Sequence, residues 1–91
     1  MYALAVSVTI EAGKQEEAQA ALESQVIPMI KQSPGLQGGY FMQPQEGVGY
    51  SLLVFDTEEN ASNGAEMAKN APRPEFVEVG AVQVMEVVAS I

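Results

Sequence analysis

The sequence predicts one α+β domain whose elements follow the order β-α-β-β-α-β. Three observations carry this prediction. Residues 2–10 alternate without a break between larger apolar and small side chains, which is the period of a strand. The region between Gly13 and Ser33 and the region 57–69 have apolar residues at helical spacing. An apolar hairpin lies between these two regions, and a valine-rich strand over 76–89 follows them.

The length of 91 residues allows one domain, which we place over residues 1–91. A chain this short buries only roughly 60–65% of its unfolded surface, so a lone monomer would be marginally stable. The hydrophobic fraction of 47% is too high for a disordered segment. We therefore expect a folded domain that gains further burial by pairing with a second copy of itself.

The first strand, 2–10, has two different apolar faces. One face carries larger side chains and the other small ones: Tyr2, Leu4, Val6, Val8 and Ile10 against Ala3, Ala5, Ser7 and Thr9. A strand face that meets water usually carries longer polar side chains. Both faces of this strand are therefore expected to be covered.

The first helix is expected to begin after the turn at 11–13 and to end at 33–35. Its acidic first turn, Glu16 and Glu17, suits the positive end of the helix dipole. Pro28 lies inside the pattern and predicts a kink or a fresh start near 26–27.

The middle of the chain predicts a β-hairpin. Residues 38–43 form its first strand, 44–47 its turn and 49–55 its second, strongly apolar strand. The last strand, 76–89, loses its alternation near Gly80 and Ala81, which predicts a β-bulge.

The second helix is expected over 57–69, with Asp56 as its N-cap and Glu59 completing a capping box. Its inner face offers only alanines, and Asn63 and Gly64 lower its helix propensity. We expect this helix to hold the sheet weakly and to act as the gate of any cavity beneath it.

The order of elements is the ferredoxin-like arrangement, in which both helices cover one face of a four-stranded antiparallel sheet. The small residues on the other face of the first strand predict that a second subunit's sheet packs there. The predicted partner is thus a second copy of the chain, and the interface carries Ala3, Ala5, Ser7 and Thr9.

Composition excludes several function classes. A net charge of -8, with four scattered basic residues, argues against binding to nucleic acid or to an anionic membrane. With no cysteine and no histidine, the common nucleophile–base pairs and zinc sites are absent, and no carboxylate spacing suggests another metal. We expect no metal and no cofactor. No signal peptide or membrane-spanning run is apparent, so we expect a cytoplasmic protein.

Three stretches resemble the antibiotic biosynthesis monooxygenase-like (ABM) domains. Residues 2–14 are similar to the first strand and turn of that family. Residues 26–30 and 33–40 resemble its helix end and following Pro-Gly passage, and 54–61 its exit from the third strand. The resemblance covers essentially the whole chain. It implies the dimeric α+β barrel, in which two ferredoxin-like subunits face each other through their sheets.

The resemblance also implies a function and a pocket. Characterised ABM relatives include cofactor-independent monooxygenases of polycyclic aromatic substrates, haem-degrading enzymes and isomerases. Their ligand pocket lies between the sheet and the helices. Val6 stands where the family often has asparagine, and Phe55 where it usually has tryptophan. The histidine that binds haem iron in haem-degrading members has no counterpart here, because the chain has no histidine.

The resemblance and the departures from it leave two functions possible. The first is a cofactor-independent monooxygenase that acts on an apolar aromatic or polyketide-like small molecule. The second is a non-catalytic binding or structural dimer of the same fold. No catalytic residue is assigned. The residues expected to line a ligand pocket are Val6, Met29, Tyr40, Ser51 and Phe55.

Overall fold

The computed structural model describes residues 1–91. Its four strands form one antiparallel sheet in the order β2-β3-β1-β4. The strands are β1 (Tyr2–Ile10), β2 (Leu36–Phe41), β3 (Val48–Phe55) and β4 (Val77–Glu86). The helical elements are α1 (Gln15–Ala21), the π-helical turn η1 (Leu22–Val26), α2 (Ile27–Ile30) and α3 (Glu58–Asn70). This arrangement confirms the ferredoxin-like β-α-β-β-α-β fold.

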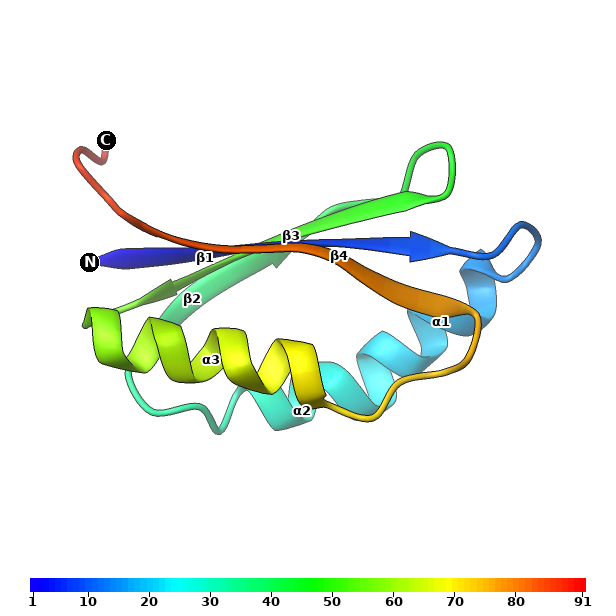
Figure 1. Ribbon diagram of the computed structural model, residues 1–91, viewed down its shortest axis with the longest axis horizontal. Helices are drawn as coiled ribbons and strands as arrows, with labels where there is room; N and C mark the ends of the chain where they lie inside the picture. Colours follow the sequence, from blue (N-terminus) through cyan, green and yellow to red (C-terminus); the bar gives the residue numbers. More distant parts are fainter.

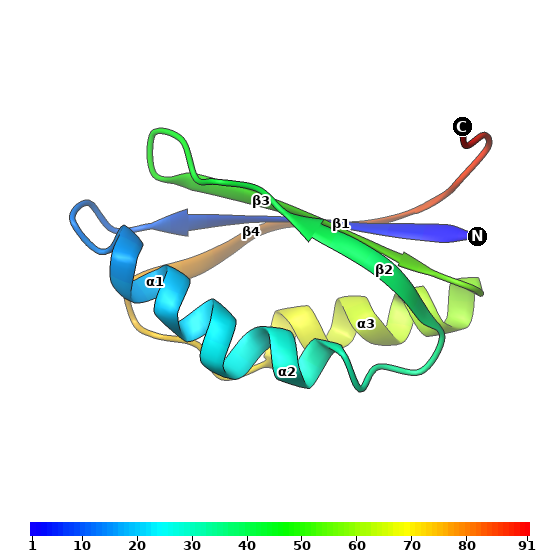
Figure 2. The ribbon, with the colours of Figure 1, turned by 180° about the vertical axis from the view of Figure 1, so that it is seen from behind.

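All helices lie on one face of the sheet, and the opposite face is bare (Figure 1). From behind, α1 and α2 form one long rod that runs beneath the sheet beside α3 (Figure 2). The N-terminus and the C-terminal tail lie at the same end of the molecule (Figure 1). None of the helices is both long and apolar enough to cross a membrane. The molecule thus has two layers, and we call its uncovered side the open face.

Strand β1 lies in the middle of the sheet and separates the two faces as its alternation predicts. Leu4 points toward the helices, is completely buried, and stands in register with Leu53 and Val84. Ala5 belongs to the open face, where its neighbour on β3 is Leu52. A one-residue slip would exchange these faces, so the burial of Leu4 sets the register of the sheet.

The expected β-bulge lies between β1 and β4. Their register shifts between Val6 and Val8, where two residues of β4, Gly80 and Ala81, stand opposite Ser7. The Ser7 hydroxyl accepts a hydrogen bond from the Ala81 N–H at 2.8 Å. Ser7 therefore pairs an amide that the bulge removes from the regular ladder.

Strand ends differ from the sequence prediction where the neighbouring strand decides the pairing. Strand β2 begins at Leu36 rather than 38, because Leu36 pairs with Phe55 across a register shift. Strand β4 ends at Glu86 rather than 89, because its partner Tyr2 is the first residue of β1. The hairpin turn follows the prediction, with positive φ at Glu46 (53°) and Gly47 (80°).

The first helical segment restarts at Ile27, as Pro28 predicts. In η1 the Ile27 N–H bonds to the Leu22 carbonyl, five residues earlier rather than four. Pro28 has no N–H, so it cannot donate the next α-helical bond. The widened turn accommodates that gap and connects α1 to α2.

Helix α3 packs closely on the sheet, contrary to the expectation that it holds the sheet weakly. Ala61 and Ala65 are buried in one cluster with Leu4, Leu53 and Phe55. Gly64, one of the residues that lower the propensity of this helix, allows its close approach, because an added Cβ there would collide with the Phe55 ring. The predicted N-cap also needs correction. The cap is Thr57, whose hydroxyl accepts from the Asn60 N–H at 3.1 Å, while Asp56 accepts from the Asn60 side chain.

Candidate ligand cavity

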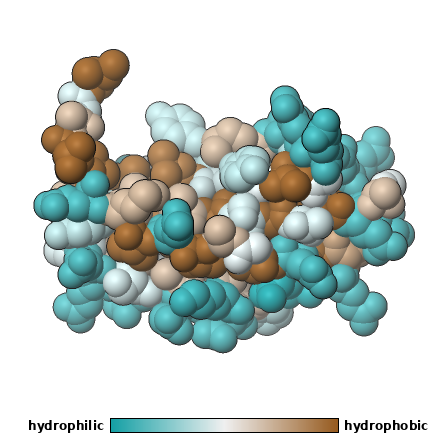
Figure 3. Space-filling view, turned by 45° about the horizontal axis from the view of Figure 1, so that its top comes forward, coloured by the Kyte–Doolittle hydropathy of each residue, from teal (hydrophilic) through white to brown (hydrophobic).

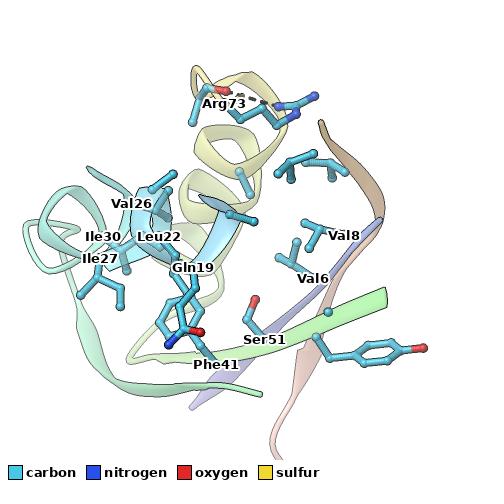
Figure 4. Close-up of a pocket in the computed structure, with 18 of the residues that line it drawn as sticks. Val6, Val8, Gln19, Leu22, Val26, Ile27, Ile30, Phe41, Ser51 and Arg73 are labelled. Carbon is cyan, nitrogen blue, oxygen red and sulfur yellow. Dashed lines mark hydrogen bonds between the residues drawn. The ribbon is translucent and has the colours of Figure 1, made fainter. Parts of the chain in front are cut away.

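A cavity of about 400 Å³ lies between the first helical segment and the sheet (Figure 4). It arises because the two helical layers approach the sheet differently. Helix α3 packs against β1, β3 and β4, whereas α1, η1 and α2 make few contacts with any strand. The half of the sheet beneath α3 is filled core, and the half beneath the first helical segment is hollow.

The floor of the cavity is the helix-facing side of three neighbouring strands. Val6 on β1, Ser51 on β3 and Phe41 on β2 stand side by side in the register of the sheet. Val8 follows Val6 along β1, and its neighbour on β3 is Gly49, which Val8 and Pro44 cover. The small side chain of Ser51 thus leaves the hollow above β3.

The opposite wall is apolar. Leu22, Val26, Ile27 and Ile30 line it from η1 and α2, facing the strand residues (Figure 4). Met29 and Met67 also line the cavity, from α2 and α3. An apolar cavity with few polar groups is the usual form of a small-molecule site.

Two charged side chains, Glu23 and Arg73, line the cavity, and both are exposed. The Glu23 carboxylate accepts a hydrogen bond from Gln19 at 3.2 Å. The Arg73 guanidinium donates to the Lys69 and Ala71 carbonyls at the end of α3, at 3.5 and 3.3 Å. Both charges therefore belong to the solvent-facing part of the wall.

The two serines of the cavity differ in their partners. The Ser33 hydroxyl donates to the Met67 sulfur at 3.9 Å. The Ser51 hydroxyl makes no hydrogen bond within the chain and points into the cavity (Figure 4). Ser51 is thus the polar point of an otherwise apolar floor.

Four of the five predicted pocket residues line this cavity, and Tyr40 does not. Val6, Met29, Ser51 and Phe55 lie around one space. Tyr40 pairs with Leu52, lies on the open face and is 71% exposed in the single chain. Its position follows from the alternation of β2, in which the next residue, Phe41, takes the inward place. A binding role for the four cavity residues stays a prediction.

Sequence reasoning did not single out several residues that shape the cavity, including Leu22, Val26 and Phe41. The helical spacing of Leu22 and Val26 was visible, but the same spacing is expected of residues packed in a core. What distinguishes the two cases is the distance between the helix and the sheet, which a local pattern does not contain.

The one titratable group with a shifted pKa lies outside the cavity. The pKa of the Tyr2 hydroxyl is raised from its ordinary value, chiefly by the negative charge of Glu86, then by burial and by Glu58. Tyr2 does not line the cavity, and Glu86 is an exposed residue of the edge strand β4. No cluster of three or more histidine, cysteine, aspartate or glutamate residues could hold a metal ion.

The fold defines the class of protein: a ferredoxin-like α+β domain. No family profile and no curated protein matches the sequence. Solved structures match over the whole chain. The heme degrader MhuD from Mycobacterium tuberculosis, with two hemes bound in its active site, is 17% identical with a TM-score of 0.74, covering 100% of this chain and 99% of that one.

Two further structures show the same likeness. A mutant of MhuD with two manganese protoporphyrin IX molecules bound per active site is 18% identical, with a TM-score of 0.73, covering 100% of this chain and 98% of that one. A protein of unknown function from Nitrosomonas europaea is 19% identical, with a TM-score of 0.58, covering 100% and 94%. At these identities the likeness establishes the fold.

The cavity residues do not fit a heme site built on an imidazole ligand. The chain has no histidine and no cysteine, so the commonest protein ligands of heme iron are missing. Met29, Met42 and Met67 line the cavity, but methionine usually binds heme iron together with a histidine. The bound hemes of MhuD therefore do not carry over to this chain.

Proposed function

We propose that the protein is an ABM-like homodimer that takes an apolar aromatic or polyketide-like small molecule into the cavity and oxygenates it without a cofactor. The observation that carries the proposal is the apolar cavity of about 400 Å³ between the sheet and the first helical segment. Its volume lies within the range of about 300–1,000 Å³ typical of small-molecule sites. Its walls disfavour polar metabolites. Such a molecule gives up its hydrogen bonds to water on entering, and few lining side chains could form new ones with it.

The proposed reaction asks little of the protein's side chains. An electron-rich phenolate or enolate reduces O₂ by itself, so the cavity mainly orients the ligand and shields it from water. In the oxidation of a ring CH₂ group to a carbonyl, one atom of O₂ becomes the carbonyl oxygen. The other leaves as water with the two hydrogens, and the ligand supplies all the electrons. This balance fits a cavity that lacks histidine and cysteine.

The proposal includes dimerisation through the open face. The single chain buries only 10 of its 91 residues, a small core for a stable monomer. The open face carries exposed apolar groups along its middle with hydrophilic side chains around them (Figure 3). Tyr40, Tyr50 and Met85 are 71, 59 and 45% exposed there. A second sheet packed on this face would cover them and hold the floor of the cavity rigid.

A second candidate function is binding without chemistry. It is favoured by the side chains at two positions, where Val6 and Phe55 replace the asparagine and tryptophan that ABM domains commonly have. In that case the domain stores, carries or senses the same class of ligand.

Oxidation of anthrone to anthraquinone distinguishes the two functions. Anthrone is a tricyclic ligand whose enolate reacts slowly with O₂ unaided. We expect the protein to bind anthrone and to accelerate anthraquinone formation above the rate with an equal amount of a cavity-filled variant, Val6→Trp. Binding without acceleration supports the second function. A protein that neither binds nor oxidises any tricyclic or bicyclic aromatic probe contradicts both.

A further inference from the structure

We propose that the Ser51 hydroxyl selects the ligand: the cavity prefers an aromatic molecule with one hydrogen-bonding oxygen, a phenol or a ketone, over a hydrocarbon of the same shape. This inference rests on the proposed function, because it assumes that the cavity takes an aromatic ligand. It adds the chemical group that the ligand carries and the point of the protein that recognises it.

The position of Ser51 is fixed by the sheet. Strand β3 lies between β1 and β2, so Ser51 is held in antiparallel ladders on both sides. Its neighbours in register are Val6 and Phe41, which offer no polar atom from their side chains. The hydroxyl points from this rigid floor into the cavity (Figure 4). Rotation about the Cα–Cβ bond therefore decides where the hydroxyl oxygen lies, and the O–H then turns toward its partner.

The other polar side chains around the cavity are already paired or face water. Ser33 donates to Met67, Gln19 donates to Glu23, and Arg73 donates to backbone carbonyls. Gln15 and Gln43 are exposed and keep their contact with solvent. The Ser51 hydroxyl is half-buried and has no partner in the chain. A ligand that fills the floor displaces the water available to this one group.

Because this water is displaced, the hydroxyl discriminates between ligands that can bond to it and ligands that cannot. A serine hydroxyl offers one donor and accepts at two positions. A hydrocarbon pressed against it leaves the group dry and unpaired, which weakens binding. A phenol or ketone oxygen restores the hydrogen bond and removes this penalty. A site that pairs a ligand oxygen thereby disfavours the analogue that lacks it.

A pair of probes of nearly equal shape tests the inference. α-Naphthol and α-methylnaphthalene differ by a hydroxyl in place of a methyl group. The chain has no tryptophan, so the fluorescence of either probe reports binding directly. We expect Ser51→Ala to weaken naphthol binding about three- to tenfold and to tighten methylnaphthalene binding, because no hydroxyl is then left unpaired against the hydrocarbon.

The cavity supplies a matched control. Ser33→Ala removes the other serine hydroxyl of the cavity, which is already bonded to Met67, and should leave the ratio of the two affinities unchanged. Ser51→Thr keeps a hydroxyl and should keep the preference. Circular dichroism melting of each variant checks that it is folded.

Two results overturn the inference in different ways. If both probes bind and the ratio of their affinities is the same in wild type and Ser51→Ala, Ser51 does not select the ligand, while the proposed function stands. If neither probe binds the wild-type protein, the cavity is not an aromatic site, and the proposed function falls with the inference.

Discussion

Residues without large side chains decide how closely helix α3 approaches the sheet. A Cβ atom added at Gly64 would lie 2.7 Å from Cζ of Phe55, closer than real Cβ contacts. The ring of Phe55 is 1% exposed and packs in one cluster with Leu4, Leu53 and Ala61, so it must shift to admit an added methyl group.

Gly64→Ala should destabilise the protein. Overpacking against the Phe55 ring costs about 1–3 kcal/mol, and the better helix propensity of alanine returns about 1 kcal/mol of it. We expect a net loss of about 1 kcal/mol in the free energy of unfolding, measured in urea at fixed protein concentration. Asn63→Ala, at the exposed neighbouring position, should instead be neutral or slightly stabilising. Equal effects of the two variants would contradict the close contact.

Val6→Trp should fill the cavity. Val6 lies on its floor, and an indole there would occupy the space between the floor and η1. We expect loss of α-naphthol binding, measured by equilibrium dialysis because the variant itself contains a tryptophan, with the oligomeric state unchanged. Val88→Trp makes the same chemical change at a residue that is 92% exposed, and should bind as wild type. Undiminished binding by Val6→Trp would place the ligand elsewhere.

The sequence correctly predicted on which face of a strand a side chain of β1 lies. It did not predict which residues surround each side chain. The alternation of 2–10 correctly placed Val6 on the helix side and Ala5 on the open face. Tyr40 was expected to line the pocket, because a buried phenol needs a hydrogen-bond partner, which a ligand could supply. Its inward or outward direction depends on the pairing with Leu52, a contact twelve residues away that no local pattern specifies.

At the scale of elements, the two helical segments pack differently against the sheet. Helix α3 is capped, continuous and packed on the core, whereas the first segment is divided by η1 and stands away from the sheet. Helix propensity alone suggested the opposite, because α3 contains asparagine and glycine. Propensity describes an isolated helix, and tertiary packing overrides it when small residues allow close contact. The gate of the cavity is therefore better sought in residues 15–30.

Thr57→Ala should weaken α3 from its N-terminus. The Thr57 hydroxyl accepts the Asn60 N–H, and removal of such a cap costs about 0.5–2 kcal/mol. We expect a loss of about 1 kcal/mol in the free energy of unfolding, followed by circular dichroism. Thr57→Ser keeps the acceptor and should be close to wild type. A neutral Thr57→Ala would show that Asp56, as the sequence suggested, does the capping.

At the scale of the whole molecule, the open face is an apolar surface that the single chain leaves uncovered (Figure 3). Its centre is built from small side chains on β1, flanked by Leu52 and Tyr40 toward one edge and by Met85 toward the other. Small residues in the middle of a sheet allow another sheet to approach closely. The small size of Ala3 and Ala5 is apparent from the amino-acid sequence, so the alternation of residues 2–10 is enough to predict a dimer.

Ala5→Glu should dissociate the dimer. The carboxylate would stand unpaired between two sheets, which costs about 3–5 kcal/mol when a buried charge has no partner. We expect light scattering to give a dimer for wild type at micromolar concentration and a monomer for the variant. Ala20→Glu makes the same change at an exposed position of α1 and should remain dimeric. A monomeric wild type would contradict the proposed interface.

Heme should not form a stoichiometric complex with this protein. No imidazole is present to bind the iron, although the fold is shared with a heme degrader. Titration of the protein with hemin should give only the weak, non-saturating spectral change of an apolar dye on a protein surface. A sharp Soret shift that saturates at a fixed ratio would contradict this prediction.

The π-helical turn has a consequence for how such a domain changes over evolution. A turn closed by a bond over five residues holds one residue more than an α-helical turn at the same place. Deleting one residue from 22–26 would close this turn as ordinary α-helix and remove the widened turn from the cavity wall, while α1 and α2 keep nearly the same faces toward the sheet. The strands and their register would be untouched. Changes in chain length at this point therefore reshape the wall of the cavity while the scaffold stays the same, which makes it a place where ligand preference can diverge.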